Sequence, residues 1–515
     1  MDPRSLALDG DTLTLEALEE VCLGADRPVT LAGHARDRVA RAREVVDRAV
    51  RENRVVYGLT TGFGRLAETV ISSDRLEELQ LNLIRSHACG VGRPLSRAET
   101  RAITLLRANV LAKGHSGIRP EVIDLLLELL NRGVHPVIPE QGSVGASGDL
   151  APLSHLALVL VGEGEAEVGG EVVAGGEALS RAGLEPVRLA AKEGLALNNG
   201  TQAMTGVGAL TLLRAERLVE TAEVAGATSL EGLRGTPEAF HPALQAVRPH
   251  PGQVESASRL RAILAESEIR ESHLHDDPRV QDAYALRCMP QVHGAARNAF
   301  RYIREVRETE ANSATDNPLI FPDELDEDGR PGRVVSGGNF HGQPVAQVLD
   351  LLSIALADLA SLSERRTERL VNPDLSALPA FLTREPGLHS GFMIAQITAA
   401  ALVSECKGLA HPSSVDSITT GANKEDHVSM GMSAAIRARK VLENAETVLA
   451  IELLCAAQAL EFLKPLRPGN GVRRAYDAIR ERIEPLGDDR VLAPDIEAAT
   501  ALVRSGVFAR IARDA

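Results

Sequence analysis

Residues 142–150 read Gly142-Ser143-Val144-Gly145-Ala146-Ser147-Gly148-Asp149-Leu150. The three glycines permit backbone conformations that side chains would forbid, so the chain can turn back tightly on itself at Ala146-Ser147-Gly148. In such a turn the amide nitrogen of Gly148 can attack the carbonyl carbon of Ala146, and loss of water closes a five-membered ring. Loss of the Ser147 hydroxyl as a second water leaves an exocyclic alkene. The product would be an electrophile, which no ordinary side chain provides.

Two familiar glycine-rich motifs do not fit this stretch. The spacing G-x-x-x-x-G-K-[ST] is missing, which excludes a nucleotide P-loop. The residue two before Ser147 is Gly145, but the residue two after it is Asp149, so the G-x-S-x-G elbow of serine hydrolases is excluded as well. The simplest remaining alternative is a glycine-rich loop before a helix that Asp149 caps.

The wider segment, which continues as Ala151-Pro152-Leu153-Ser154-His155, resembles the signature of the aromatic amino acid ammonia-lyases. In that family Ala-Ser-Gly becomes 4-methylidene-imidazol-5-one (MIO), and the resemblance extends from about Leu13 to Leu463. It implies a mainly α fold with a long-helix bundle of the fumarase and aspartase type. It also implies a homotetramer in which each active site takes loops from three subunits. MIO would form autocatalytically from Ala146, Ser147 and Gly148, with no external cofactor and no metal.

Composition restricts the possible partners. The chain has 515 residues, of which 44% are hydrophobic and 25% charged, a balance typical of soluble globular proteins. The net charge of -15 disfavours binding to nucleic acid or to an anionic membrane. The first residues lack the pattern of a signal peptide, and no run approaches the ~18 apolar residues of a membrane span. The five cysteines form no C-x-x-C, which predicts free thiols and a cytoplasmic location.

Hydrophobic periodicity predicts a protein built mainly from helices. Helical patterns cover about residues 16–23, 35–52, 75–88, 97–113 and 120–131, residues 165–176 alternate as in a β-hairpin, and long apolar patterns follow Pro344 and cover 433–463. Because residues 448–460 are apolar nearly all round, we expect them to be buried in a bundle or between subunits. We therefore predict a smaller mixed N-terminal region, residues 1–205, and a helical bundle with C-terminal helices, residues 206–515.

Three motifs in the first half match positions with roles in the family. Tyr57 opens the loop Tyr57-Gly58-Leu59-Thr60-Thr61-Gly62-Phe63-Gly64, and the resemblance makes it the base that removes the substrate's β-proton. His87 follows Ser86, a pair that marks the histidine-specific members, where other members carry Phe-Leu or His-Leu. Asn199 matches the asparagine that contacts the prosthetic ring and the substrate carboxylate. Its neighbour Asn198 stands where relatives usually have an apolar residue, so the sequence leaves open which amide faces the site.

Further candidates lie in the second half. Gln281, Tyr284 and Arg287 are three residues apart, and a guanidinium suits an α-carboxylate because it can pair with it bidentately. The resemblance assigns these three to substrate binding or proton transfer, and Phe340 to packing against the prosthetic group. Glu425 stands where relatives specific for phenyl and phenol rings carry Gln, and we expect its carboxylate to pair with an imidazole N–H and to take part in catalysis. Lys424 and Cys406 depart from the usual Gln and Asn. Asn312 and Asn317 extend the match.

The resemblance therefore implies an enzyme, a carbon–nitrogen lyase that converts L-histidine, its small-molecule substrate, to trans-urocanate and ammonia. A tyrosine or phenylalanine lyase, or an aminomutase on the same scaffold, is the first alternative, and His87 and Glu425 disfavour it. The second alternative is a metal hydrolase that uses His273, His275 and Asp276, or an inert helical assembly protein. A solvated turn before Pro278 is the simpler interpretation of those three residues.

Overall fold

The computed structural model describes residues 5–24, 27–145, 147–275, 277 and 279–515. Two compact units divide the chain. The first comprises residues 1–210, 304–350 and 412–436, and the second comprises 211–303, 351–411 and 437–515. These units differ from the expected division at residue 205, because the chain returns to the first unit twice through loops between long helices. Both returns carry candidate site residues, including Phe340 and Glu425.

Helices of the first unit follow the sequence pattern closely. Their bounds are α1 (Leu15–Leu23), α2 (Gly33–Arg51), α3 (Leu76–His87), α4 (Arg97–Ala112), α5 (Pro120–Asn131), α6 (Leu150–Leu160), α7 (Gly175–Arg181) and α8 (Glu193–Asn198), with 3-10 turns at Gly64–Leu66, Ser73–Arg75 and Gly421–Asn423. Local chemistry explains several boundaries. Ser96 and Glu99 form a capping box at the start of α4, and Pro120 occupies the first turn of α5. The expected helices in this half are confirmed to within two residues at each end.

The strands of the first unit are short and form small separate sheets. Parallel β1 (Leu6–Leu8) and β2 (Val29–Leu31) make one pair, and antiparallel pairs join β3 (Val91–Pro94) to β5 (Pro139–Gln141) and β8 (Leu319–Leu325) to β9 (Pro331–Val335). A three-stranded sheet has the order β4 (Val134–Pro136), β6 (Glu165–Val168), β7 (Glu171–Ala174). β6 and β7 are the predicted hairpin. β5 ends at Gln141, so the small sheet delivers the chain directly into the Gly142–Leu150 stretch.

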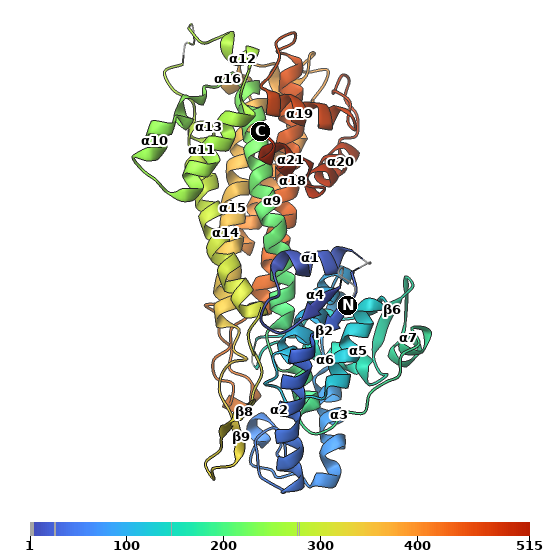
Figure 1. Cartoon of the computed structure of the whole chain (residues 1–515). Coiled ribbons are helices and arrows are strands. Elements are labelled where there is room, and N and C mark those ends of the chain that lie inside the picture. Colours follow the sequence, from blue (N-terminus) through green and yellow to red (C-terminus); the bar gives the residue numbers. More distant parts are fainter. Residues whose placement is uncertain (1–4, 25–26, 146, 276, 278) are drawn as a thin grey trace. The chain divides into compact units, whose positions relative to one another are not determined.

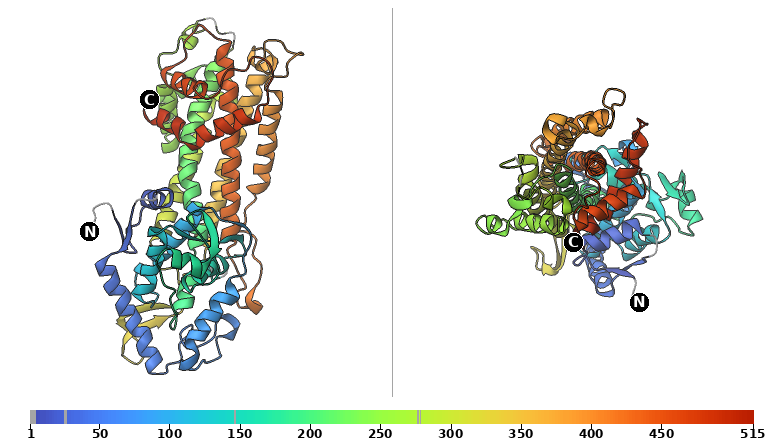
Figure 2. Two further views of the ribbon diagram at one scale, coloured as in Figure 1. Left: turned by 90° about the vertical axis from the view of Figure 1, so that its right-hand side faces the viewer. Right: turned by 90° about the horizontal axis from the view of Figure 1, so that it is seen from above.

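The four longest helices are α9 (Gln202–Gly232), α14 (Met289–Ala311), α15 (Gln343–Val371) and α18 (Gly431–Glu461). Within the second unit they run alongside one another (Figures 1 and 2). Residues 448–460 of α18 are buried throughout, as their apolar composition predicts. By length and composition alone α15 could span a membrane, contrary to the expectation that no segment is apolar enough to do so. However, 61% of its apolar window is buried, as is typical of a core helix. The prediction of a mainly α fold is confirmed.

Shorter helices complete the second unit. They are α10 (Pro242–Ala246), α11 (Pro251–Ile263), α12 (Glu268–Glu271), α13 (Tyr284–Arg287), α16 (Pro373–Ser376), α17 (Met393–Leu409), α19 (Asn470–Arg480), α20 (Ala493–Arg504) and α21 (Val507–Arg513), with 3-10 turns at Pro237–Phe240 and Ala380–Leu382. The five cysteines of the chain are free, as predicted.

Candidate active site

The Ser147-Gly148 turn adopts a backbone conformation that few residues tolerate. Ser147 has φ +51° and Gly148 has φ +78°, both in the left-handed region. A Cβ on Gly148 would lie 2.1 Å from the carbonyl oxygen of Gly200, so only glycine fits there. Ala146, the third member of the predicted tripeptide, lies outside the described residues. Ser147 and Gly148 therefore adopt the left-handed backbone of a tight turn, and both fit the MIO group.

Asp149 fixes the turn from behind. Its backbone N–H donates to the carbonyl of Gly200 at 2.6 Å, and its buried carboxylate accepts bonds from the Met204 N–H at 2.8 Å and the Ser143 hydroxyl at 2.9 Å. Burial raises the pKa of this carboxyl to about 6, and the hydrogen bonds from Met204 and Ser143 oppose that rise. The helix α6 begins next to Asp149, as expected. The Asp149 side chain makes no capping bond to α6, because its carboxylate accepts the Met204 N–H at the start of α9 instead.

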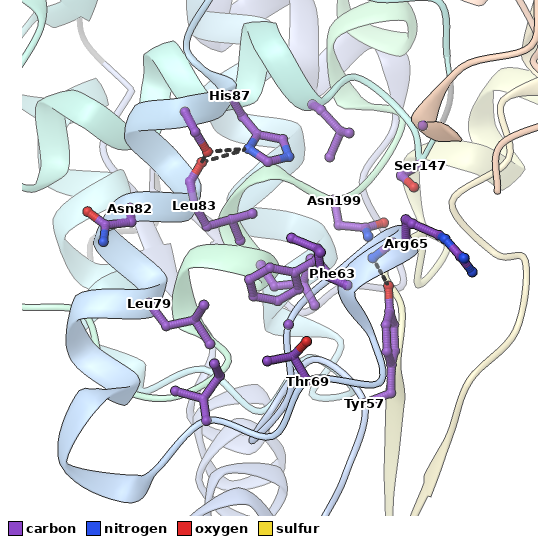
Figure 3. A pocket seen from close by; sticks show the side chains of 18 of the residues that line it. Tyr57, Phe63, Arg65, Thr69, Leu79, Asn82, Leu83, His87, Ser147 and Asn199 are labelled. Carbon is purple, nitrogen blue, oxygen red and sulfur yellow. Dashed lines mark hydrogen bonds between the residues drawn. The ribbon is translucent and has the colours of Figure 1, made fainter. Parts of the chain in front are cut away.

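The Tyr57 loop connects α2 to the 3-10 turn at Gly64–Leu66. Leu59, wholly buried, fastens the loop to an apolar core that includes Val46 and Leu76. The Gly64 N–H donates to the Tyr57 hydroxyl oxygen at 3.4 Å (Figure 3). The Tyr57 side chain therefore lines the site from a loop that Leu59 holds against the apolar core.

A cavity of about 630 Å³ brings the predicted residues together. Its wall contains residues from five separate segments: Tyr57, His87, Ser147 and Asn199, which Figure 3 labels, and Glu425. An adjoining cavity of about 540 Å³ shares four of them, lacks His87 and includes Phe340 and Lys424. The first volume suits a small organic ligand.

His87 closes the first cavity at the last residue of α3. Its Nδ1 lies 2.8 Å from the Leu83 carbonyl oxygen and 3.0 Å from the Ser86 hydroxyl (Figure 3). Because a carbonyl oxygen only accepts, we assign the proton of the neutral ring to Nδ1, which leaves Nε2 as an acceptor. Removal from water lowers the pKa of His87, while the Leu83 carbonyl and the negative charge of Glu425 act in the opposite direction. His87 therefore offers the cavity a neutral acceptor. The Glu425 carboxylate, which accepts the Thr420 hydroxyl at 2.8 Å, offers a charged one.

Of the two adjacent amides, Asn199 faces the site and Asn198 does not. Asn199 lines both cavities, and its buried side-chain oxygen has no hydrogen-bond partner among the described residues. Asn198 instead donates to the Ser154 hydroxyl at 3.2 Å within the core. The fully buried Arg107 donates to the Asn199 carbonyl at 2.7 Å and fixes the backbone there. Asn199 thus holds a free acceptor ready beside Ser147.

Three predicted residues, Gln281, Tyr284 and Arg287, belong to the second unit, whereas the described walls of both cavities are formed by the first unit. Gln281 and Tyr284 are exposed. The Arg287 guanidinium lies 4.5 Å from the centre of the Tyr284 ring, and its buried Nε has no hydrogen-bond partner among the described residues. Asn312 has a structural role, since its amide group bonds to both the N–H and the carbonyl of Leu13.

The cavity also contains residues that the motifs did not indicate. Leu79, Asn82 and Leu83 lie on α3, and Phe63 lies in the Tyr57 loop (Figure 3). Leu79 and Leu83 precede His87 by eight and four residues, so the helical period would have placed all three on one face of α3.

The alternative metal site receives no support from its geometry. Both ring nitrogens of His273 lie within hydrogen-bond distance of carbonyl oxygens, those of Ile269 and Gly235. Asp276 lies outside the described residues. Among the residues that are described, no group of three or more His, Cys, Asp or Glu side chains is placed to hold a metal ion.

Known proteins resemble this chain along almost its whole length. A family model described as "Aromatic amino acid lyase" matches residues 13–481. A histidine ammonia-lyase of Anaeromyxobacter dehalogenans (strain 2CP-C) is 58% identical over 512 residues, covering 98% of this chain and 99% of the relative. The crystal structure of histidine ammonia-lyase from Trypanosoma cruzi is 46% identical, with a TM-score of 0.91 over 99% of this chain and 95% of that one. The tyrosine aminomutase structure from Streptomyces globisporus is 38% identical, with a TM-score of 0.92 over 98% of each chain. These matches overturn the alternatives of a metal hydrolase and an inert assembly protein, and the chain belongs to the aromatic amino acid lyase family.

Proposed function

We propose that this protein eliminates ammonia from L-histidine to give trans-urocanate. The observation that carries the proposal is the cavity, in which Tyr57, Ser147 and Asn199 meet two acceptors suited to an imidazole, His87 and Glu425. The relative with 58% identity is a histidine ammonia-lyase, which supports the same substrate. Similarity to tyrosine aminomutase shows that the scaffold alone does not select the ring, so the side chains around it must do so.

We propose further that Ala146, Ser147 and Gly148 form MIO without an external cofactor. The left-handed backbone of Ser147 and Gly148 and membership of the family support this step. When formed, the group supplies an electrophile that captures the substrate amine and makes it a better leaving group. Asp149 holds the turn against the start of α9 through its bonds to Gly200 and Met204. Phe340 lines the adjoining cavity beside Ser147.

The remaining side chains of the cavity bind and orient the substrate. Tyr57 is the base that removes the β-proton, and it lies in the wall of both cavities together with Ser147. The free oxygen of Asn199 is an acceptor for the N–H group of a captured amine. An imidazole N–H can donate to Nε2 of His87 or to the Glu425 carboxylate, and a phenyl ring would offer no donor to either of these half-buried acceptors.

We also propose a homotetramer in the cytoplasm, with sites shared between subunits. Arg287 and Tyr284 belong to the second unit, and in the proposed assembly a neighbouring subunit supplies them to the cavity. Exposed isoleucines on α15 (Ile354) and on α17 (Ile394 and Ile397) support burial of these helices against another copy. The free cysteines support a reducing compartment.

The experiment that tests the electrophile is Ser147→Ala. Alanine has no hydroxyl to eliminate, so we expect a folded variant that forms almost no urocanate from L-histidine. Wild type should lose activity when borohydride adds to the alkene, whereas the variant should offer borohydride no such target. Near-normal turnover by Ser147→Ala would overturn the proposed mechanism. Circular dichroism of the variant provides the control for folding.

A further inference from the structure

Another cavity of the first unit has three arginines and one carboxylate, Glu167, in its wall and has no part in the proposed reaction. Its volume is about 610 Å³, and none of its lining residues lines the active-site cavities. Arg97 and Arg101 of α4, Arg132 after α5 and His135 of β4 contribute to its wall. We call it the basic cavity.

Arg101 brings a buried charge that has no counter-ion among the described residues. The residue is 7% exposed, and its guanidinium donates to the carbonyl oxygens of Val21 at 2.8 and 3.0 Å and of Leu130 at 3.0 Å. No carboxylate of the described residues pairs with it. Carbonyl groups satisfy three of its donors but leave its charge in place. A buried charge that is not paired is costly, so an anion at this position would be stabilised.

The other two arginines are already partly neutralised. Arg97 forms an ion pair with Glu167, and Arg132 forms one with Glu128 at 2.5 Å. Among the described residues, two carboxylates therefore pair with Arg97 and Arg132, and none pairs with Arg101. The resulting field reaches His135, whose pKa burial lowers to about 4 with help from the charges of Arg101 and Arg97, while Glu167 opposes them.

The cavity also has room for a ligand. The turn between β6 and β7 contributes Gly169 and Gly170 to the wall, and a Cβ added to either would meet nothing within 4 Å. Arg97 and Arg132 have half-exposed side chains, so a ligand can reach them from solvent. Open space thus adjoins a buried cation and two accessible ones.

We propose that the basic cavity binds a small oxyanion whose phosphoryl group accepts hydrogen bonds from Arg101 and Arg132. A guanidinium fork matches the spacing of two phosphoryl oxygens, and a tetrahedral dianion can bond to more than one such fork. The same group could come from free phosphate or from a small phosphate ester. β4, which carries His135, is followed by β5 and then by the Gly142–Leu150 stretch, so an anion here would bind close in sequence to the catalytic turn.

The test is isothermal titration of the full-length protein with inorganic phosphate and, separately, with glycerol phosphate, at constant ionic strength in chloride. We expect one saturable site per chain for at least one of the two, and the stronger ligand identifies the source. Arg101 also holds two backbone carbonyls, so the more exposed Arg132 provides the decisive variant. Arg132→Gln should weaken binding by about tenfold or more.

The matched control is Arg181→Gln, which removes another exposed arginine of the first unit, one paired with Glu171 and Glu177. Its affinity for the anion should equal that of wild type. Absence of saturable binding, or equal binding by wild type, Arg132→Gln and Arg181→Gln, would overturn the proposal. Because the readout is binding and not turnover, the outcome is independent of the proposed lyase activity.

Discussion

At the scale of single residues, two acceptors decide which ring the cavity accepts. Nε2 of His87 and the Glu425 carboxylate come from α3 and from the loop before α18, more than 300 positions apart in the printed sequence. A fully buried acceptor left without a donor costs ~1 to 3 kcal/mol, and more when it is charged. His87 and Glu425 are half-buried, so together they should disfavour phenylalanine by about a hundredfold or more.

Exchange of these residues should change the substrate preference. Combining Ser86→Phe and His87→Leu with Glu425→Gln should lower kcat/KM for L-histidine by about a hundredfold or more, since the His87 acceptor and the negative charge of Glu425 are lost. Some turnover of phenylalanine or tyrosine should appear. The measurement compares the three amino acids in wild type, each partial exchange and the full exchange. Glu78→Gln, which changes an exposed carboxylate on α3, is the control. A full exchange that keeps the preference for histidine would show that other residues select the ring.

Residue patterns predicted this site only in part. Ser147 and Gly148 could be derived from chemistry, because a glycine nitrogen and a serine hydroxyl are what the ring closure needs. Tyr57, Asn199 and Glu425 could not, since nothing in their local spacing shows that they meet. The family resemblance supplied them. The role of Asp149 was missed, because the Met204 N–H that donates to its carboxylate lies 55 positions away in the sequence.

At the scale of elements, helices were predictable and most strands were not. A helix such as α4 carries its signals locally, in an apolar period and a capping box. β1 and β2 have three residues each, and they pair across a helix, so their register depends on contacts distant in sequence. The hairpin of β6 and β7 was predicted because its alternation and its turn are adjacent.

One contact between elements should make stability depend on pH. The Glu231 carboxylate in α9 accepts the Gly469 N–H, just before α19, at 2.9 and 3.1 Å. Burial raises the pKa of Glu231 from 4.5 to about 7, against the hydrogen bonds from Ser267 and Gly469. Between pH 4.5 and about pH 7, Glu231 is therefore protonated in the folded protein and ionised in the unfolded chain. The free energy of unfolding should therefore fall as the pH rises from about 4.5 to 7, by on the order of 3 kcal/mol from this group.

Glu231→Gln tests this dependence, because the amide cannot ionise. In urea unfolding across this pH range, the free energy of unfolding of Glu231→Gln should increase relative to that of wild type as the pH rises. Glu238→Gln, at an exposed position in the same unit, should follow wild type throughout. A stability difference between Glu231→Gln and wild type that stays constant with pH would contradict the assignment.

At the scale of the whole molecule, the central question is where Arg287 acts. If one subunit supplies Ser147 and another supplies Arg287, two inactive variants can complement each other. Ser147→Ala and Arg287→Met chains, each inactive alone, should recover up to about a quarter of wild-type activity when co-expressed and randomly assembled, since half of the chains carry each intact residue. Each variant expressed alone is the control. If the mixture stays as inactive as the separate variants, each site is built from a single chain.

The most direct test of the account is product formation by the wild-type protein from L-histidine, L-tyrosine and L-phenylalanine, each assayed separately for kcat/KM. The two acceptors in the cavity predict urocanate as the main product, with a preference for histidine of about a hundredfold or more over either other amino acid. A preference for tyrosine or phenylalanine, or no urocanate from histidine, would contradict the proposed substrate.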